Sequence, residues 1–382
     1  MPGVVWGLLS VAFVLTVDGP KKAAVALEPN GGSVAAASGS STNASEPGAA
    51  LIRGRARFIP SDRETTEVGE LFRLGPAEFD YTMRKTRETA DLTVWRVTFP
   101  SPLPSPLPEN NVVPLDYFAP KVPAPGGADR RPAVVVLHIL GADFALSRYL
   151  CARLAQRGVA AAFLQLPYYG DRRPPGGDQR FLSADIERSV AAMRQGVCDV
   201  RYAVAWLAQR PEVDPERLGV AGISLGGIIS SLVAANDPHV REGAFLLAGG
   251  GLDDILWDMP EREARLYKRK WLELGRTKAD LTQLTSSYDP LTYASRLKGK
   301  RLLMIAGNVD EVVPAESAQR LWDAAGRPPI RWLDCGHYSA AAYLLPEMRN
   351  VVEFFVEGPY APPRPPILGN PPPPMSHSIG RE

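Results

Sequence analysis

Cysteine and histidine are scarce in this chain, with three and four residues among 382. The cysteines, Cys151, Cys198 and Cys335, are odd in number, which excludes a disulfide framework that pairs all of them. We expect buried thiols instead. No HExxH, paired CxxC or GxxxxGK[ST] motif occurs, so the sequence requires neither a metal ion nor a nucleotide cofactor.

Charge of one sign is not in excess either. The chain has 43 Lys and Arg against 42 Asp and Glu, a net charge of +1. This balance offers no general attraction for nucleic acid or for an anionic membrane surface, so we expect a small-molecule partner. Because 45% of its 382 residues are hydrophobic, the chain can form one large α/β domain with appendages or two ordinary domains.

The two ends of the chain lack the pattern of a packed domain. Residues 4–17 form an apolar run interrupted only by Gly7, Ser10 and Thr16, and Ala24-Val25-Ala26 follows. This pattern predicts a signal peptide or an uncleaved anchor over residues 1–26, and therefore export, released or tethered to a membrane. Lys21 and Lys22 follow the apolar run instead of preceding it, a departure from standard signal peptides. Residues 27–55 predict a disordered linker and residues 359–382 a Pro-rich disordered tail.

Between these ends, short apolar runs alternate with helix-like segments. The runs predict buried parallel strands at residues 133–137, 159–166, 218–223, 244–247 and 302–305. Helix-like segments lie at residues 144–157, 184–209, 225–235 and 315–325. Strand-like residues 91–99 and 112–118 are expected to add antiparallel edge strands. This rhythm predicts an α/β domain over residues 56–358, with a mostly parallel central sheet and helices on both faces.

Ser224 lies in the sequence GISLGG (residues 222–227), directly after one predicted strand and directly before a predicted helix. The glycines permit a tight strand-to-helix turn, which presents the serine hydroxyl as a nucleophile. The helix directs its N-terminal dipole at the reacting centre, and the N–H of Leu225 is a candidate oxyanion donor. The alternative is a structural glycine-rich turn with an incidental serine, which leaves the partners downstream unexplained.

An acid and a histidine follow Ser224 in the chain order that hydrolases with such a turn use. Asp310 comes directly after a predicted strand, with Glu311 and Asp334 as alternative acids. His337 follows the acid and precedes the Pro-rich tail. We predict that His337 accepts the serine proton and that Asp310 orients the imidazole through its Nδ1–H.

The loop that follows the first central strand is the predicted source of the second oxyanion donor. It begins with His138-Ile139-Leu140-Gly141, at the position where such hydrolases take this donor. The N–H of Leu140 is our candidate and the N–H of Ile139 the alternative. His138 itself is expected to brace the loop.

Three motifs carry a specific resemblance: LPYYGDRRP (166–174), GISLGG (222–227) and GHYSA (336–340). On these residues the chain resembles the α/β-hydrolase superfamily and, within it, the group containing alpha/beta-hydrolase domain-containing protein 18, roughly over residues 130–355. The resemblance implies the α/β-hydrolase fold and supports the three catalytic assignments. It does not name a substrate.

The first of these motifs follows the second central strand, so we expect it near the mouth of the pocket. Tyr168 or Tyr169 is a candidate for lining an acyl site, and Arg172 or Arg173 for binding an anionic group. The alternative is a proline-braced loop with solvated arginines.

Residues 252–298 interrupt the strand pattern where this fold usually carries a small helical lid. Trp257 and Met259 are looser candidates for lining a pocket. A stripe at helical spacing predicts packing of the lid on the core: Ala264, Tyr267, Trp271 and Leu274.

Together these patterns predict a carboxylesterase-type serine hydrolase that cleaves a small-molecule carboxylic ester through an acyl-enzyme and needs no cofactor. Alternatives within enzymes are a prolyl-oligopeptidase-like serine peptidase, a lipid acyl-hydrolase and a thioesterase. Residues 1–130 are too short for the propeller that usually precedes the catalytic domain of such a peptidase. The alternative of another class is a binding protein that keeps the fold without turnover. The sequence predicts no oligomeric state.

Overall fold

The computed structural model of the chain describes residues 50–141, 144–183, 185–260 and 262–358. The predicted signal peptide or anchor, most of the predicted linker and the predicted Pro-rich tail lie outside the described residues, and export stays a prediction. One boundary differs from the expectation. Strand β1 begins at Ile52, so the last four residues of the predicted linker, 52–55, belong to the sheet.

The described residues form a ten-stranded sheet in the order β1-β2-β3-β4-β6-β5-β7-β8-β9-β10. Strands β1 to β4 pair antiparallel, β4 pairs antiparallel with β6, and neighbouring strands from β6 to β10 run parallel. The strands are β1 (Ile52–Phe58), β2 (Ala77–Glu88), β3 (Leu92–Pro100), β4 (Val112–Pro120), β5 (Arg131–Leu137), β6 (Ala160–Leu164), β7 (Val213–Ile223), β8 (Val240–Leu246), β9 (Arg301–Gly307) and β10 (Ile330–Leu333).

The five predicted central strands are confirmed as β5 to β9, and the two predicted antiparallel strands as β3 and β4. Strands β1, β2 and β10 have no counterpart among the predicted segments. The first two form an outer ladder with charged side chains on one face, where Arg55 lies opposite Asp80 with Nε 3.0 Å from Oδ1. Such strands lack an apolar run. Strand β10 has only four residues.

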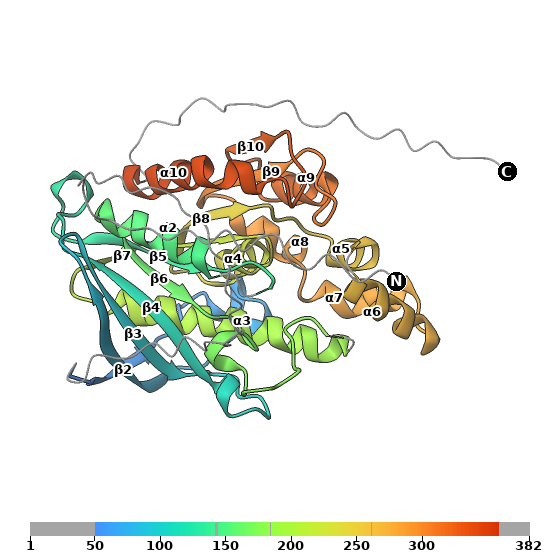
Figure 1. Cartoon of the computed structure of the whole chain (residues 1–382), viewed down its shortest axis with the longest axis horizontal. Coiled ribbons are helices and arrows are strands. Elements are labelled where there is room, and N and C mark those ends of the chain that lie inside the picture. Colours follow the sequence, from blue (N-terminus) through green and yellow to red (C-terminus); the bar gives the residue numbers. More distant parts are fainter. Residues whose placement is uncertain (1–49, 142–143, 184, 261, 359–382) are drawn as a thin grey trace, which may run out of the picture. The chain divides into compact units, whose positions relative to one another are not determined.

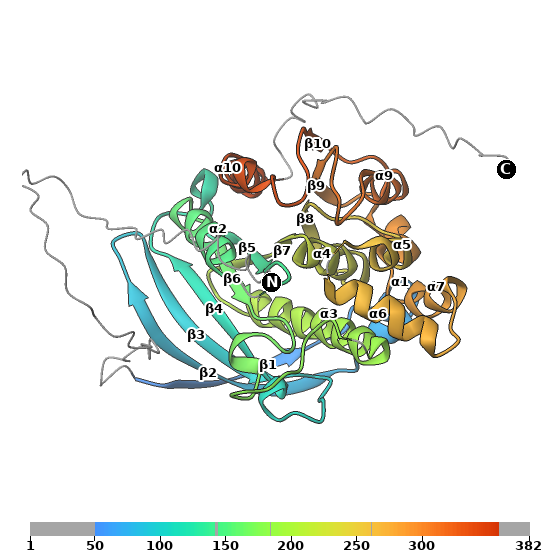
Figure 2. The same ribbon diagram turned by 45° about the vertical axis from the view of Figure 1, so that its right-hand side comes forward.

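Helices cover both faces of the sheet, as the alternating pattern predicts. Helices α2 and α10 lie on one face and α3 and α4 on the other (Figures 1 and 2). Each face has its own apolar core, because the side chains of buried parallel strands point alternately to the two sides. The helices are α2 (Ala145–Gln156), α3 (Ile186–Ala208), α4 (Leu225–Asn236), α9 (Ala315–Ala324) and α10 (Ala341–Glu357).

The segment between β8 and β9, predicted as a lid insertion, is helical. Its elements α5, α6 and α7 pack together beside the sheet (Figure 1). Within the described residues, no helix is long and apolar enough to cross a membrane. The elements of the segment are α5 (Leu252–Asp258), α6 (Arg262–Glu273), α7 (Lys278–Ser286), α8 (Pro290–Tyr293) and the 3-10 helix η5 (Ala294–Leu297).

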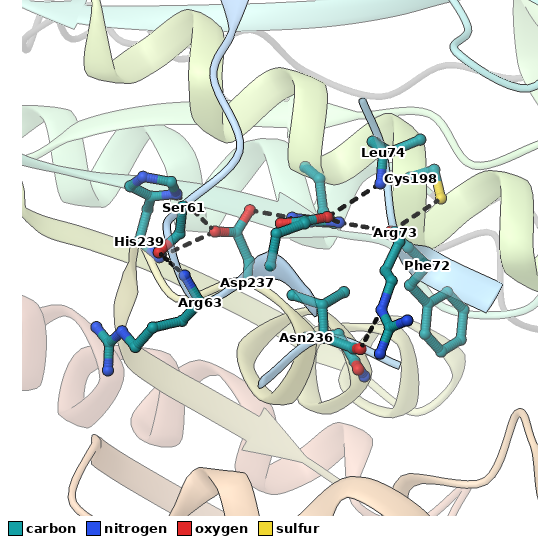
Figure 3. A network of polar contacts seen from close by, with 12 residues as sticks. Ser61, Arg63, Phe72, Arg73, Leu74, Cys198, Asn236, Asp237 and His239 are labelled. Carbon is teal, nitrogen blue, oxygen red and sulfur yellow. Dashed lines mark hydrogen bonds and ion pairs between the residues drawn. The ribbon is translucent and has the colours of Figure 1, made fainter. Parts of the chain in front are cut away.

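A buried ionic network fastens the segment between β1 and β2 to the rest of the domain. Arg201 of α3 is buried, and its guanidinium lies 2.7 Å from Glu64 in the short helix α1 (Glu64–Glu67) and 3.4 Å from Asp237 at the end of α4. Asp237 also accepts a hydrogen bond from the ring of His239, as Figure 3 shows. A buried charge is tolerated when it is paired in this way. The network therefore places this N-terminal segment firmly on α3.

Candidate active site

Ser224 sits on a strained turn between β7 and α4. Its φ of 54° and ψ of −119° lie outside the regions that non-glycine residues favour. Glycines make this turn possible: a Cβ on Gly222 would lie 2.2 Å from the carbonyl carbon of Gly226, and a Cβ on Gly226 would lie 2.6 Å from the carbonyl oxygen of Leu137. Helix α4 starts directly after Ser224, and the N–H of Ile228 donates to the carbonyl oxygen of Ser224.

The parallel strands bring three of the predicted site residues to one edge of the sheet. Ser224 follows β7, Asp310 follows β9 and His337 follows β10, and the carboxyl ends of parallel strands share an edge. His337 Nε2 lies 2.9 Å from Ser224 Oγ. On the other side of the ring, Nδ1 lies 2.8 Å from Asp310 Oδ2 and 3.0 Å from Oδ1. A serine, an imidazole and a carboxylate thus form one hydrogen-bonded chain.

Asp310 is held in place by its own loop. Its Oδ1 accepts hydrogen bonds from the backbone N–H groups of Val312 (2.9 Å) and Val313 (2.7 Å), and its side chain is buried. Neither alternative acid contacts the imidazole ring in this way. Glu311 accepts the backbone N–H of His337, and Asp334 accepts the side-chain amide of Asn308. The geometry therefore selects Asp310 as the carboxylate that can orient the ring.

A narrow apolar cavity of about 70 Å³ opens beside Ser224. None of the residues that line it carries a charge, and besides Ser224 only Ser189 and Thr285 contribute hydroxyl groups. Most of the lining comes from α3, α4 and α5, so the predicted lid supplies one wall. The apolar lining residues are Leu140, Leu182, Ile186, Val190, Met193, Leu225, Ile228, Leu252, Ile255, Leu256, Met259, Val312 and Val313.

Both predicted oxyanion donors adjoin this cavity. Leu225 is the first residue of α4, and the first N–H groups of a helix have no partner within it. Leu140 lines the cavity from the loop after β5, whereas Ile139, the alternative donor, packs with the core on the other face of the sheet. Their role as donors remains a prediction.

His138 braces this loop, as the sequence predicts. It is fully buried: the N–H of Leu166 donates to Nε2 (3.1 Å), and Nδ1 lies 2.7 Å from the carbonyl oxygen of Ile139. Burial lowers the pKa of His138 to about 4, so the ring is neutral and fits one acceptor and one donor nitrogen. His138 thus ties the loop after β5 to the loop after β6.

Tyr168 and Tyr169 do not line the cavity beside Ser224, contrary to the sequence prediction. Both are buried. The backbone N–H of Tyr168 donates to Asn110, and the ring of Tyr169 packs edge-on against His138 with centroids 4.6 Å apart. Burial raises the pKa of Tyr169 to about 12, and its hydroxyl makes a hydrogen bond with the backbone of Gly141. Tyr169 therefore supports the loop after β5 rather than the cavity.

Arg172 is not available to a substrate either, and this corrects the sequence prediction. Its side chain is 0% exposed, and its Nη1 lies 2.7 Å from Oδ2 of the equally buried Asp199 in α3. The guanidinium also donates three hydrogen bonds to the backbone carbonyl oxygens of Asn110 and Gln165. Arg172 instead holds the loop after β6 on α3. Both sequence-based interpretations of Arg172, as an anion-binding residue and as a solvated arginine, are therefore wrong.

This buried pair predicts a large stability effect for Arg172→Ala. Removal of the cation leaves Asp199 buried without its partner, which typically costs about 3–5 kcal/mol in the free energy of unfolding. Arg173→Ala is the matched control, because Arg173 is only partly buried and donates to one carbonyl oxygen, that of Tyr168. Urea unfolding followed by fluorescence measures both variants. Equal stability of Arg172→Ala and Arg173→Ala would contradict this role.

The predicted helical stripe of the lid is confirmed in part. Ala264 and Trp271 are buried and Tyr267 is half-buried, but Leu274 lies beyond the end of α6 and is 64% exposed. Met259 lines the cavity beside Ser224. A second small cavity, lined by Trp257, Tyr267 and Trp271, shares four residues with the first: Leu182, Ile186, Ser189 and Leu256.

The three cysteines are free and buried, as predicted. Among the described residues, no group of three or more His, Cys, Asp and Glu side chains could hold a metal ion.

Comparison with known families gives two matches. Residues 56–243 match the family described as Alpha/beta hydrolase domain containing 18, and residues 192–330 match the prolyl oligopeptidase family. The first match begins within β1, ends within β8 and includes the Ser224 turn. The second covers the Ser224 turn and the Asp310 loop, and ends before His337.

Two individual proteins are each similar to about half of the chain. The uncharacterized protein Rv2627c of Mycobacterium tuberculosis is 30% identical over 184 residues, which are 45% of this chain and 40% of that protein. Esterase YjfP of Escherichia coli is 24% identical over 201 residues, 50% of this chain and 74% of the esterase. The chain thus spans about two fifths of the length of Rv2627c.

A solved structure supports the fold. The acetyl xylan esterase from Paenibacillus sp. R4 superposes with a TM-score of 0.57 at 18% identity, over 72% of this chain and 88% of the esterase. The sheet order, the Ser224 turn and the matched residues lead to one placement: the chain belongs to the α/β-hydrolase superfamily and resembles the family described as Alpha/beta hydrolase domain containing 18.

Proposed function

We propose that the chain is a serine hydrolase that cleaves a carboxylic ester through an acyl-enzyme. The observation that carries this proposal is the chain of hydrogen bonds from Ser224 through His337 to Asp310. Each of the three groups has a geometry suited to its role: a hydroxyl on a strained turn, an imidazole within proton-transfer distance, and a buried carboxylate on the far ring nitrogen.

The proposed reaction has two halves. Ser224 Oγ attacks the ester carbonyl carbon while His337 Nε2 accepts the hydroxyl proton, and the carbonyl oxygen gains negative charge that the N–H groups of Leu225 and Leu140 stabilise. Collapse of this intermediate breaks the bond to the alkoxy oxygen, which leaves as an alcohol with the proton from His337. A water molecule then attacks the acyl group on Ser224, again with His337 as base, and releases the carboxylic acid.

The cavity beside Ser224 supports an ester with a neutral, apolar acyl group. An acid or base on the acyl group would have no charged partner among the lining residues, and burial of an unpaired charge is costly. Ester hydrolysis is also the activity for which esterase YjfP, a relative, and the acetyl xylan esterase, a structural neighbour, are named.

A fluorophosphonate probe tests the proposal directly. The probe mimics the transition state at a serine nucleophile, so it is expected to form a covalent adduct on the peptide that contains Ser224. Mass spectrometry of the digested protein locates the adduct. Folded protein that stays unlabelled under these conditions would instead support the non-catalytic binding protein.

A serine peptidase is the second candidate, because residues 192–330 match the prolyl oligopeptidase family. The two candidates differ in the leaving group that they accept. We expect the chain to hydrolyse p-nitrophenyl esters, while peptide anilides with matched acyl groups react far more slowly. The reverse preference would favour the peptidase, and thioesters and phospholipids in the same panel separate the remaining acyl-hydrolase alternatives.

A further inference from the structure

The two loops that carry Asp310 and His337 contact each other along their backbones. The N–H of Asn308 donates to the carbonyl oxygen of Leu333 (2.8 Å), and the N–H of Val309 donates to that of Cys335 (3.3 Å). A Cβ on Gly307 would lie 2.5 Å from the carbonyl oxygen of Cys335. The position of the imidazole therefore depends on the contacts between these two loops. Glu311, the residue after Asp310, makes a further contact between them.

Glu311 reaches across to the histidine from the opposite side of the loop. Its Oε2 accepts the backbone N–H of His337 at 2.8 Å. A Cβ at position 336 would lie 2.3 Å from the same oxygen, so the close approach needs Gly336. Partial desolvation acts to raise the pKa of Glu311, but hydrogen bonds from the backbone N–H groups of His337, Glu311 itself and Tyr338 outweigh it, and the pKa is lowered. The carboxylate form is thus the one that the loop binds.

We infer that Glu311 is a positioning residue of the proposed reaction: its carboxylate holds the backbone of His337 so that the ring stays between Asp310 and Ser224. The inference rests on the proposed function. Two consecutive carboxylates thus hold His337: Asp310 contacts its ring at Nδ1, and Glu311 accepts its backbone N–H. Small displacements of a catalytic base are costly, because proton transfer requires close alignment.

Glu311 also adds a negative charge near the imidazolium that forms during the reaction. The carboxylates of the two loops are Asp310 against the ring, Glu311 against the backbone, and Asp334, which accepts from Asn308. Because Glu311 is exposed, solvent and salt screen its charge. The electrostatic part of its effect is therefore expected to be small and to fade at high ionic strength.

Kinetics of three variants measure this role. Glu311→Ala is expected to lower kcat for a p-nitrophenyl ester by about 10- to 100-fold with KM changed less than about twofold, because the ring is misplaced while the cavity is intact. Glu311→Gln keeps an oxygen acceptor and should lose only about three- to tenfold. At low ionic strength, the acidic limb of the pH–rate profile of Glu311→Gln should move slightly to lower pH, because the protonated ring loses a nearby, solvent-screened negative charge. Asp334→Asn, the matched control, removes a charge from the His337 loop without touching the Glu311 contact. It should change neither kcat nor the acidic limb.

A double-mutant cycle separates positioning from a general loss of stability. Gly336→Ala is expected to displace the Glu311 side chain, which can move because it is exposed, and so to slow the enzyme about as much as Glu311→Ala. In the Glu311→Ala background, the same Gly336→Ala change should cost less than about threefold, because the contact is already lost. Fully multiplicative effects would overturn the inference.

The experiment distinguishes failure of this inference from failure of the proposed function. If wild-type protein neither binds the fluorophosphonate probe at Ser224 nor hydrolyses esters, the proposed function fails first. If the wild type is active and Glu311→Ala keeps its kcat and pH–rate profile, only the role of Glu311 is refuted. If Glu311→Ala does not fold, kcat and the pH–rate profiles of Glu311→Gln and Gly336→Ala test the role of Glu311 instead.

Discussion

Replacement of Ser224 with alanine is expected to lower kcat/KM for a p-nitrophenyl ester by about 10⁴-fold or more. In the proposed mechanism the variant lacks the nucleophile, so no acyl-enzyme forms, and any remaining rate comes from the proposed oxyanion donors and from binding. The hydroxyl of Ser224 contacts His337, but the turn is shaped by the glycines around it, so the fold should persist. Initial rates of ester hydrolysis, with circular dichroism as the check on folding, measure the effect.

The same experiment includes the partner of the serine. His337→Ala alone should cost roughly 10³-fold or more, and the double variant Ser224→Ala/His337→Ala should be little slower than the worse single variant, because the two groups act as a unit. Wild-type rates in Ser224→Ala would remove this serine from the mechanism. Multiplication of the two losses would mean that the groups act independently.

Asp310→Asn is expected to lower kcat by about 10³- to 10⁴-fold with little change in KM. An asparagine at this position fits the site sterically but can offer an N–H to the ring nitrogen, and this favours the tautomer in which Nε2 cannot accept the serine proton. In the wild-type chain, the Asp310 carboxylate accepts hydrogen bonds from the His337 ring and from two backbone N–H groups. The pH dependence of kcat for the variant and the wild type gives the measurement.

Asp334→Asn serves again as the matched control, because Asp334 lies on the His337 loop and accepts from Asn308 rather than from the ring. Its kcat should stay within about twofold of the wild type. A large loss in Asp334→Asn together with an active Asp310→Asn would transfer the role of the acid to Asp334.

The centre of the molecule could be predicted from sequence because strong physical constraints act there. A parallel strand buried on both faces needs a continuous apolar run, and each predicted run became one of β5 to β9. The turn at Ser224 requires glycines at set positions, which makes it visible as a short motif. Chain order then pointed to Asp310 and His337, and the structure brings both to Ser224.

The loop after β6 could not be predicted in the same way. Two arginines beside prolines look solvent-exposed or ready to bind an anion, yet Arg172 is buried because Asp199 lies opposite it in the fold. Nothing in the local sequence marks Asp199 as that partner. Tyr169 shows the same limit, since its role depends on contact with His138 and Gly141, which lie on a different loop.

The acidic pair at residues 310 and 311 shows a finer limit. The sequence places both carboxylates shortly after β9, and it does not decide which of them contacts the ring of His337. The backbone turn decides between them, because Asp310 accepts the N–H groups of Val312 and Val313 while the side chain of Glu311 leaves on the other side. Backbone hydrogen bonds of this kind are not visible in a residue pattern.

Strand β10 is the outermost parallel strand of the sheet and has four residues, yet it carries the loop that contains His337. Short border strands open more readily than central ones. We therefore expect the strand that carries the His337 loop to open at a lower temperature than β7, the central strand that precedes Ser224. On heating, activity should therefore be lost at a lower temperature than the one at which the central strands unfold.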